Sequence, residues 1–243
     1  MPTGDVLDRE TKARRGTAAL QILWFPVIAF VVVVLAAWLA KPLVEQVLDS
    51  AVVHDFDTRT LAWFRAQATP SLDRVFQGIT LLGSAFAMMV FAFLGISVLV
   101  NQRRWLLLFA WDVLFLGMWA LTQTIKPIFH RARPDGAEQF LYGMSYSFPS
   151  THALGAIAGF GMIAFAVAEA AELEREPRAV LWMFTTVLVV TIGVSRLYLG
   201  VHYVSEVVAG FLLGAVWLVV CLFALRRARG NIRMVTNAPS AQS

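Results

Sequence analysis

The chain has 243 residues, of which 58% are hydrophobic and only 15% are charged. Soluble domains carry about 25% charged residues, so we expect lipid rather than water to solvate most of this surface. The net charge of +4 does not indicate nucleic-acid binding, because Lys and Arg cluster at the ends of apolar runs. The single cysteine, Cys221, lies inside an apolar run and excludes a disulfide framework or a cysteine-based metal site.

Six apolar segments are candidate membrane spans, each of which requires about 20 mostly apolar residues. In chain order they cover residues 19–40, 79–100, 105–124, 153–167, 180–194 and 204–225. The segment at residues 50–75 mixes aromatic with charged side chains and is too polar to span, which favours a helix at the membrane interface. We therefore predict an all-α integral membrane protein, a six-transmembrane-helix bundle with an interfacial helix between spans one and two.

Lys and Arg residues are unevenly distributed around these spans. They gather before span one, between spans two and three, between spans four and five, and after span six. With six spans these positions share one side of the membrane, which the positive-inside rule makes cytoplasmic. A six-span domain at residues 19–225 then lies between cytoplasmic tails at residues 1–18 and 226–243. The outward loops are residues 41–78, 125–152 and 195–203. Short loops and a compact size suit a bacterial inner membrane.

The polar residues that could carry out chemistry lie in and beside the second and third outward loops. The ends of spans three and five and the starts of spans four and six meet the same membrane surface, so these residues converge at one depth. They comprise a lysine, two arginines, a Ser–Thr pair, two histidines and a carboxylate: Lys126, Arg133, Ser150, Thr151, His152, Arg196, His202 and Glu206.

These residue types match the needs of phosphoryl transfer. Lysine and arginine only donate hydrogen bonds, and the rigid fork of arginine fits phosphate oxygens. Ser150 and the N–H groups at the start of span four add donors, because a helix N-terminus attracts anions. Two histidines supply a nucleophile and a proton donor. His202 and Glu206 are four residues apart on one helix face, so the carboxylate can accept the Nδ1 proton and leave Nε2 free for attack.

Three stretches of the chain, residues 126–134, 149–152 and 195–206, resemble the signature motifs of the type 2 phosphatidic acid phosphatase superfamily in order and spacing. The resemblance covers residues 20–225 and implies an α-helical bundle with an extracytoplasmic active site and no required metal or cofactor. It further implies that His202 forms a phosphohistidine and that His152 protonates the leaving alkoxide. The phosphoryl oxygens would be held by Lys126, Arg133, Ser150, Arg196 and the backbone N–H of Thr151.

Two positions depart from the pattern of that superfamily. Glu206 stands where the family usually has Asp, and Thr151 where it usually has Gly. The extra methylene of Glu206 makes its arm longer, and a misplacement of about 1 Å can lower a rate by about 10²-fold. Neither change removes a reacting group, so we still predict an enzyme. We expect the two changes to alter its catalytic efficiency.

The predicted function is hydrolysis of a lipid phosphate ester or diphosphate, such as phosphatidic acid, phosphatidylglycerophosphate or an isoprenyl diphosphate. One alternative is a phosphotransferase that passes the phosphoryl group to an alcohol. Another is a non-catalytic protein that binds or transports lipid phosphates, although both histidines are present here. The expected partners are the lipid substrate and membrane lipids, with neither nucleic acid nor an obligate protein partner.

Other polar and small residues are assigned structural roles. His130 and Arg131 match no fixed position of the first motif, so we interpret them as loop residues that contact lipid headgroups. Asp57 belongs to the predicted interfacial helix and is assigned no part in the chemistry. Gly210 and Gly214 form a GxxxG pair in span six, which predicts close packing against another helix.

Overall fold

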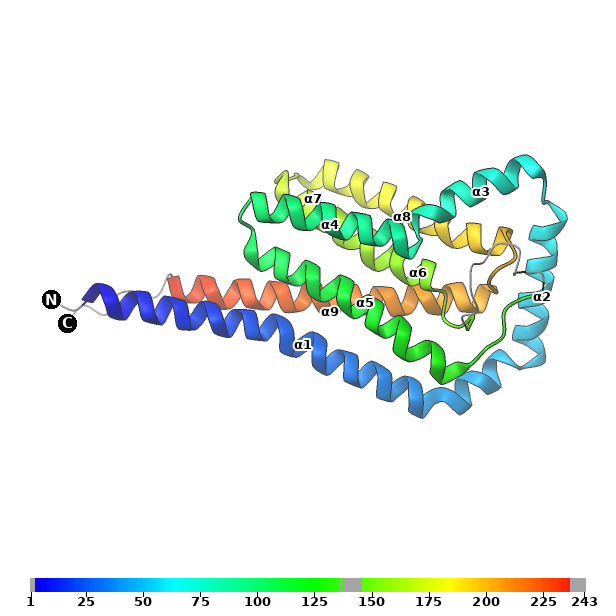
Figure 1. The fold of residues 1–243 in the computed structure, drawn as a ribbon, viewed down its shortest axis with the longest axis horizontal. Coiled ribbons are helices and arrows are strands. Elements are labelled where there is room, and N and C mark those ends of the chain that lie inside the picture. Colours follow the sequence, from blue (N-terminus) through cyan, green and yellow to red (C-terminus); the bar gives the residue numbers. More distant parts are fainter. Residues whose placement is uncertain (1–2, 136, 138–145, 237–243) are drawn as a thin grey trace.

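The computed structural model describes residues 3–135, 137 and 146–236, and side chains from residue 24 to residue 231 within those ranges. All regular secondary structure in these residues is helical (Figure 1). In chain order the elements are α1 (Thr3–Leu48), α2 (Ala51–Ala66), α3 (Pro70–Leu82), α4 (Ala85–Asn101), α5 (Trp105–Phe129), α6 (Thr151–Gly155), the π-helical turn η2 (Ala156–Phe160), α7 (Gly161–Ala170), α8 (Arg175–Tyr198) and α9 (Val204–Thr236). The prediction of an all-α protein is confirmed.

Five helical stretches are long and apolar enough to cross a membrane: Trp24–Leu48, Trp105–Phe129, Thr151–Ala170, Arg175–Tyr198 and Val204–Asn231. Helices α3 and α4 meet the same test together, which gives six crossings when the pair counts as one bent span. Large apolar side chains are exposed along the outside of the bundle, among them Leu35, Phe93, Val187 and Val219. Such an apolar exterior is expected where lipid surrounds the helices. The chain is an integral membrane protein, as predicted.

The second span differs from the single helix predicted at residues 79–100. Helix α3 ends at Leu82, and α4 begins after Ser84 at an angle of 42°. The side chain of Ser84 accepts a hydrogen bond from the N–H of Ala87 at 3.1 Å, which caps the new helix. A Cβ on Gly83 would lie 2.6 Å from Ile192 Cγ2 and 3.3 Å from His152 Cδ2, so the break lets the chain pass close to α8 and α6.

Helix α2 lies across one end of the bundle, between the end of α1 and the start of α3 (Figure 1). Ser50 caps α2 by accepting from Val53 N at 3.4 Å, and Thr69 caps α3. The interfacial helix predicted between spans one and two is therefore present. Its polar side is not wholly solvated, because Asp57 is only 1% exposed and faces inward.

Helix α9 runs through the bundle with α1 and α5 beside it and α6 and η2 packed closely against it. A Cβ on Gly210 would lie 2.5 Å from the carbonyl oxygen of Ser150, and one on Gly214 would lie 2.4 Å from Ile157 Cγ2. The helix packing predicted from the GxxxG pair is confirmed. The end of α5, the start of α6, the end of α8 and the start of α9 meet at the end of the bundle that α2 covers.

Helical structure extends into both segments that were predicted as tails. Helix α1 starts at Thr3 and α9 continues to Thr236. The start of α1 and the end of α9 lie together at the end of the molecule opposite α2 (Figure 1). The two ends of the described chain therefore share one side of the bundle, and the loops that carry the motif residues occupy the other.

Candidate active site

The residues predicted to carry out the chemistry converge where four helix ends meet. Lys126 lies in the last turn of α5, Ser150 caps α6, and Arg196 lies in the last turn of α8. His202 precedes α9, and Glu206 lies in the first turn of α9. All five side chains are buried although all are polar or charged. Buried polar groups in such a cluster require partners from one another or from a ligand.

Local backbone geometry directs the loops back toward this point. His130 ends α5 with a left-handed φ of 48°, and the chain then reverses toward Arg133. Gly200 adopts a φ of 72° in the short turn between α8 and α9, a conformation that favours glycine. The carbonyl of Arg131 accepts a hydrogen bond from the N–H of Ser147 at 2.9 Å, which joins the two arms of the α5–α6 loop.

His202 is held by Glu206, as the four-residue spacing predicted. Its Nδ1 lies 2.8 Å from Glu206 Oε2, which also accepts from Ser147 Oγ at 2.5 Å and from Tyr203 N at 3.2 Å. Arg133 Nη1 lies 3.2 Å from His202 Nε2. These partners fit a neutral ring that donates from Nδ1 and keeps a lone pair on Nε2. That lone pair is the feature a nucleophilic histidine requires.

Three cationic side chains surround this histidine. Lys126 Nζ donates to the carbonyl of Tyr146 at 2.7 Å, and Arg133 Nη1 donates to the carbonyl of Val201 at 3.1 Å. Arg196 Nη1 donates to Thr80 Oγ1 at 2.7 Å. The buried Nε of Arg196 has no hydrogen-bond partner among the described residues. Spare donors on Lys126 and Arg196 suit a bound anion with several oxygens.

The electrostatics of the site favour the uncharged form of His202. Burial lowers the pKa of His202 well below its ordinary value, and the nearby charges of Arg196, Arg133 and Lys126 lower it further. Burial also lowers the pKa of Arg133, while the charge of Glu206 opposes that shift. An anion with two negative charges would relieve the repulsion among these cations.

The start of α6 contributes the remaining predicted residues. Ser150 N donates to the carbonyl of Glu206 at 3.1 Å, and Ser150 Oγ accepts from Ala153 N at 3.5 Å. The Ser150 hydroxyl therefore keeps its own hydrogen to donate. Thr151 and His152 are half-buried first residues of α6, and His152 is near enough for its charge to act on His202. The structure thus brings all eight predicted side chains into one region.

The family model described as the PAP2 superfamily matches residues 105–229, just over half of the chain. The chain belongs to the PAP2 superfamily. All three motif stretches lie within the matched residues, whereas α2 lies before them.

Comparisons with individual proteins support this membership. The chain is 32% identical over 151 residues to phosphatidylglycerophosphatase B of Bacillus subtilis strain 168, a match that covers 60% of this chain and 71% of that relative. It is 27% identical over 183 residues to a lipid A 4'-phosphatase of Bacteroides thetaiotaomicron, covering 67% and 73%. The crystal structure of a transmembrane PAP2-type phosphatidylglycerolphosphate phosphatase from Bacillus subtilis shares the fold. Its TM-score is 0.66 at 24% identity, over 84% of this chain and 97% of that structure.

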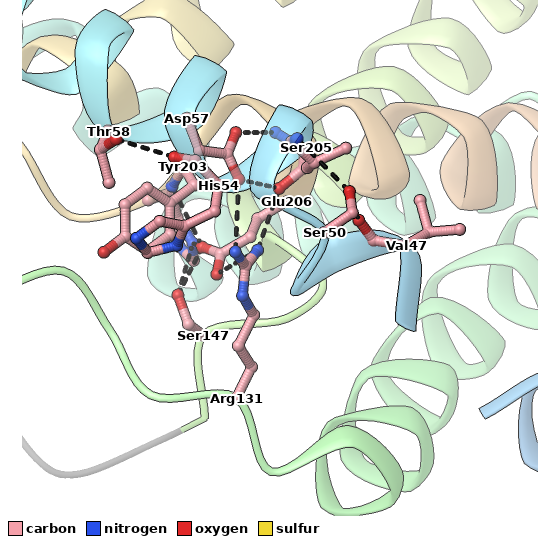
Figure 2. A network of polar contacts seen from close by, with 12 residues as sticks. Val47, Ser50, His54, Asp57, Thr58, Arg131, Ser147, Tyr203, Ser205 and Glu206 are labelled. Atoms are coloured by element: carbon pink, nitrogen blue, oxygen red, sulfur yellow. Dashed lines mark hydrogen bonds and ion pairs between the residues drawn. The ribbon is translucent and has the colours of Figure 1, made fainter. Parts of the chain in front are cut away.

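The position of Arg131 differs from the one predicted from the sequence. It was expected to be a loop residue at lipid headgroups, but its side chain is only 16% exposed and ion-paired with two carboxylates. Its Nη1 lies 3.2 Å from Glu206 Oε1, and its Nη2 lies 3.3 Å from Asp57 Oδ2 (Figure 2). His130 is exposed and its ring packs against Tyr146, so it does keep a loop position.

Sequence reasoning missed four residues of this network, namely Asp57, Arg131, Ser147 and Ser205. For Arg131 a signal existed, since a charged residue two positions before Arg133 in an outward loop is unusual. Nothing in the pattern of α2 distinguishes Asp57 from its exposed neighbour Asp55, because the facing of a helix is decided by tertiary packing.

The donor set favours an anion over a metal ion. In the part of the chain that the structure describes, no group of three or more His, Cys, Asp or Glu side chains is placed to hold a metal ion. The charges that lower the pKa of His202 belong instead to cations, among them Arg196, Arg133 and Lys126. The arrangement therefore combines a nucleophile, a second histidine and several donors around one position suited to a phosphoryl group.

Proposed function

We propose that this member of the PAP2 superfamily hydrolyses a lipid phosphate through a phosphohistidine on His202. The observation that carries the proposal is the position of His202, whose Nδ1 contacts Glu206 at 2.8 Å while Nε2 faces Arg133 at 3.2 Å. A membrane lipid phosphatase activity agrees with the family and with both curated relatives.

In the first step, Nε2 of His202 attacks phosphorus and the bond from phosphorus to the lipid oxygen breaks. Lys126, Arg133 and Arg196 hold the phosphoryl oxygens, with further donors from Ser150 and the backbone N–H of Thr151. His152 gives its proton to the leaving alkoxide, and Glu206 stabilises the positive charge that develops on the His202 ring. A charge that forms among preorganised donors is stabilised without reorganisation of solvent.

In the second step, water attacks phosphorus and the bond from phosphorus to Nε2 breaks. His152 now accepts a proton from the water, which restores it for the next cycle. Inorganic phosphate leaves, and His202 returns to its neutral form. An alcohol in place of water would make the enzyme a phosphotransferase, so the products formed with an added alcohol distinguish these two activities.

The substrate enters beside α1 and α2 in this proposal. A cavity of about 370 Å³ lies next to the site and is lined in part by Leu48, His54, Phe129, Arg133 and Tyr203. It combines apolar side chains with the arginine that faces His202, which suits a headgroup whose acyl chains remain in lipid. Phosphatidylglycerophosphate is the first substrate to test, because the relative at 32% identity is named as a phosphatase of that lipid.

The proposal also places the active site on the extracytoplasmic side, with both termini in the cytoplasm. Support comes from the basic residues in the flanks and from the position of the site at the end of the bundle opposite the start of α1.

Purified wild-type protein and His202→Ala test the mechanism with phosphatidylglycerophosphate, phosphatidic acid, undecaprenyl diphosphate and sphingosine phosphate as substrates. We expect His202→Ala to abolish phosphate release, measured with malachite green, and His152→Ala to reduce it strongly. His130→Ala, an exposed histidine of the same loop, is the matched control and should retain activity. Undiminished phosphate release by His202→Ala would contradict the mechanism.

A further inference from the structure

A guanidinium outside the assigned catalytic and phosphate-binding residues links two buried carboxylates from distant parts of the chain. Arg131 contacts Asp57 Oδ2 of α2 at 3.3 Å and Glu206 Oε1 of α9 at 3.2 Å. Asp57 is 1% exposed and Glu206 is fully buried. Figure 2 shows the Arg131 side chain rising from the loop between these two acids. Charged groups this deeply buried require well-placed partners.

Asp57 is also bound to the first turn of α9. Its Oδ1 accepts from Ser205 N at 3.0 Å, and its Oδ2 accepts from Ser205 Oγ at 2.5 Å. Arg131 Nη1 donates to the same Ser205 hydroxyl at 2.9 Å. Asp57, Arg131 and Ser205 therefore form a closed set of contacts beside Glu206 (Figure 2).

These contacts affect the two oxygens of Glu206 differently. Oε2 faces His202 and accepts from Ser147, whereas Oε1 has the ion pair with Arg131. Oε1 accepts no hydrogen bond from the described residues, and its polar contact with them is the ion pair with Arg131 at 3.2 Å. With both oxygens engaged, rotation of the carboxylate about its terminal bond is restricted. The long arm of Glu206 is thus fixed with one oxygen toward Nδ1.

We propose that Asp57 and Arg131 are positioning residues that aim Glu206 at His202, with Asp57 on α2 orienting the guanidinium that contacts Oε1. This role rests on the proposed function of His202. Asp57 also keeps Arg131 engaged on the side of Glu206 remote from His202, so the phosphoryl group is left to Lys126, Arg133 and Arg196. A residue that acts through Glu206 contributes to the chemical step rather than to substrate binding.

The experiment measures kcat and KM of Arg131→Gln, Arg131→Lys and Asp57→Asn with phosphatidylglycerophosphate in detergent micelles. We expect kcat to fall by about 10- to 100-fold in Arg131→Gln, with KM changed less than about twofold, because misaimed catalytic groups lower the rate of the chemical step. Asp57→Asn should show a smaller loss of the same kind. Arg131→Lys should recover part of kcat, since an ammonium can still pair with Oε1. The matched control is Asp55→Asn on the same helix, because Asp55 is exposed and pairs only locally with Arg59.

A double variant tests whether Arg131 acts through Glu206. In the Glu206→Gln background, Arg131→Gln should lower kcat no further, since the group it positions is already lost. Thermal unfolding of each variant identifies a loss of fold, and Arg131→Lys, which keeps the buried charge, still tests the proposal if Arg131→Gln does not fold. Additive losses in the double variant would overturn the positioning role.

Two other outcomes would also overturn it. A raised KM with unchanged kcat in Arg131→Gln would make Arg131 a substrate-binding residue, and wild-type kinetics would leave it without a role. The proposed function has a separate test. Activity in His202→Ala would refute the phosphohistidine mechanism. An inactive His202→Ala together with a fully active Arg131→Gln would refute only the positioning role.

Discussion

Burial takes the imidazole of His202 out of water, and the neighbouring cations Arg196, Arg133 and Lys126 disfavour a further positive charge there. Both effects lower the pKa of His202 well below its ordinary value of 6.5. In the proposed mechanism the ring acquires positive charge only when Nε2 bonds to phosphorus, and Glu206 lies 2.8 Å from Nδ1 to stabilise that charge. Stabilisation that appears mainly in the transition state raises the rate without tightening ground-state binding.

The lowered pKa of His202 predicts how activity depends on pH. We expect the loss of kcat/KM that reports protonation of His202 to occur only below pH 6.5, because the proposed nucleophile is the neutral ring. The unfolded chain takes up a proton at this histidine near pH 6.5 while the folded chain does not, so the free energy of unfolding should decrease below that pH. A pH–rate profile and thermal unfolding from about pH 5 to about pH 8 measure both effects. An acid limb centred at or above pH 6.5 would contradict a lowered pKa.

The cations around His202 predict that the enzyme acts without a divalent metal ion. Lys126, Arg133 and Arg196 already supply positive charge at the phosphoryl site, and they would repel a metal cation there. Phosphate release should be unchanged in excess EDTA and unaffected by added Mg²⁺ or Mn²⁺. Complete loss of activity in EDTA, restored by one of these ions, would show that a metal takes part.

At the scale of elements, the active site depends on how closely α6 approaches α9. Gly210 leaves room for the backbone of Ser150, and Ser150 N in turn donates to the carbonyl of Glu206 at 3.1 Å. This contact sets the start of α6, which carries His152, against the first turn of α9, which carries Glu206. Backbone packing therefore helps to bring the two histidines into one region.

Replacement of Gly210 by alanine should separate these two helices. Its Cβ would lie 2.5 Å from the Ser150 carbonyl oxygen, and overpacking of this kind costs about 1–3 kcal/mol. We expect Gly210→Ala to lower both the thermal unfolding temperature in detergent and kcat. Gly78→Ala is the matched control, because a Cβ there would meet nothing within 4 Å. Equal stability and activity of the two variants would contradict the close-packing argument.

Helix α2 has a second attachment to the catalytic end of the bundle. Arg65 Nη1 donates to the carbonyl of Tyr198 at 3.2 Å, and the hydroxyl of Tyr198 accepts from Thr69 N at 3.1 Å. Together with Asp57, these contacts hold α2 over the turn between α8 and α9. An element that hydropathy describes only as interfacial is thus part of the wall of the site.

Across the whole molecule, the candidate active site and a group of arginines that flank membrane spans occupy opposite ends. The site lies at the end covered by α2, whereas Arg178, Arg226 and Arg229 surround a cavity of about 440 Å³ on the far side of the bundle. A positive excess at one end is the pattern that orients membrane proteins with that end in the cytoplasm.

This separation predicts the labelling of single cysteines in spheroplasts. Ala132→Cys, exposed beside the active site, should react with an impermeant thiol reagent in intact spheroplasts. Gly230→Cys, exposed near the end of α9, should react only after lysis. Cys221 is buried and should contribute little background. The reverse pattern would place the active site in the cytoplasm.

Much of this architecture was predictable from local patterns. Spans three and six were located to within a few residues at their N-terminal ends, Trp105 and Val204, because each starts where a polar segment gives way to a long apolar run. The eight candidate site residues could be named because phosphate chemistry restricts the residue types and helix periodicity relates His202 to Glu206.

Other features depended on contacts that the sequence alone does not reveal. The break before Ser84 lies inside an apolar run, so hydropathy continued the helix through it. Asp57 and Arg131 are 74 residues apart, and their pairing depends on how α2 rests on the bundle. The sequence likewise does not reveal that Arg131 contacts the second carboxylate oxygen of the longer Glu206 side chain.

The buried Asp57 also bears on what constitutes the smallest working unit of this enzyme. The segment that matches the family model, residues 105–229, contains every proposed reacting group and phosphate ligand. It lacks α2, and with it the acid that meets Arg131 and Ser205. If Asp57 aligns Glu206 through Arg131 as proposed, the motif-bearing helices transplanted into another membrane scaffold would keep the catalytic groups but lose their alignment. A substitute carboxylate at the position of Asp57 would then be needed to restore it.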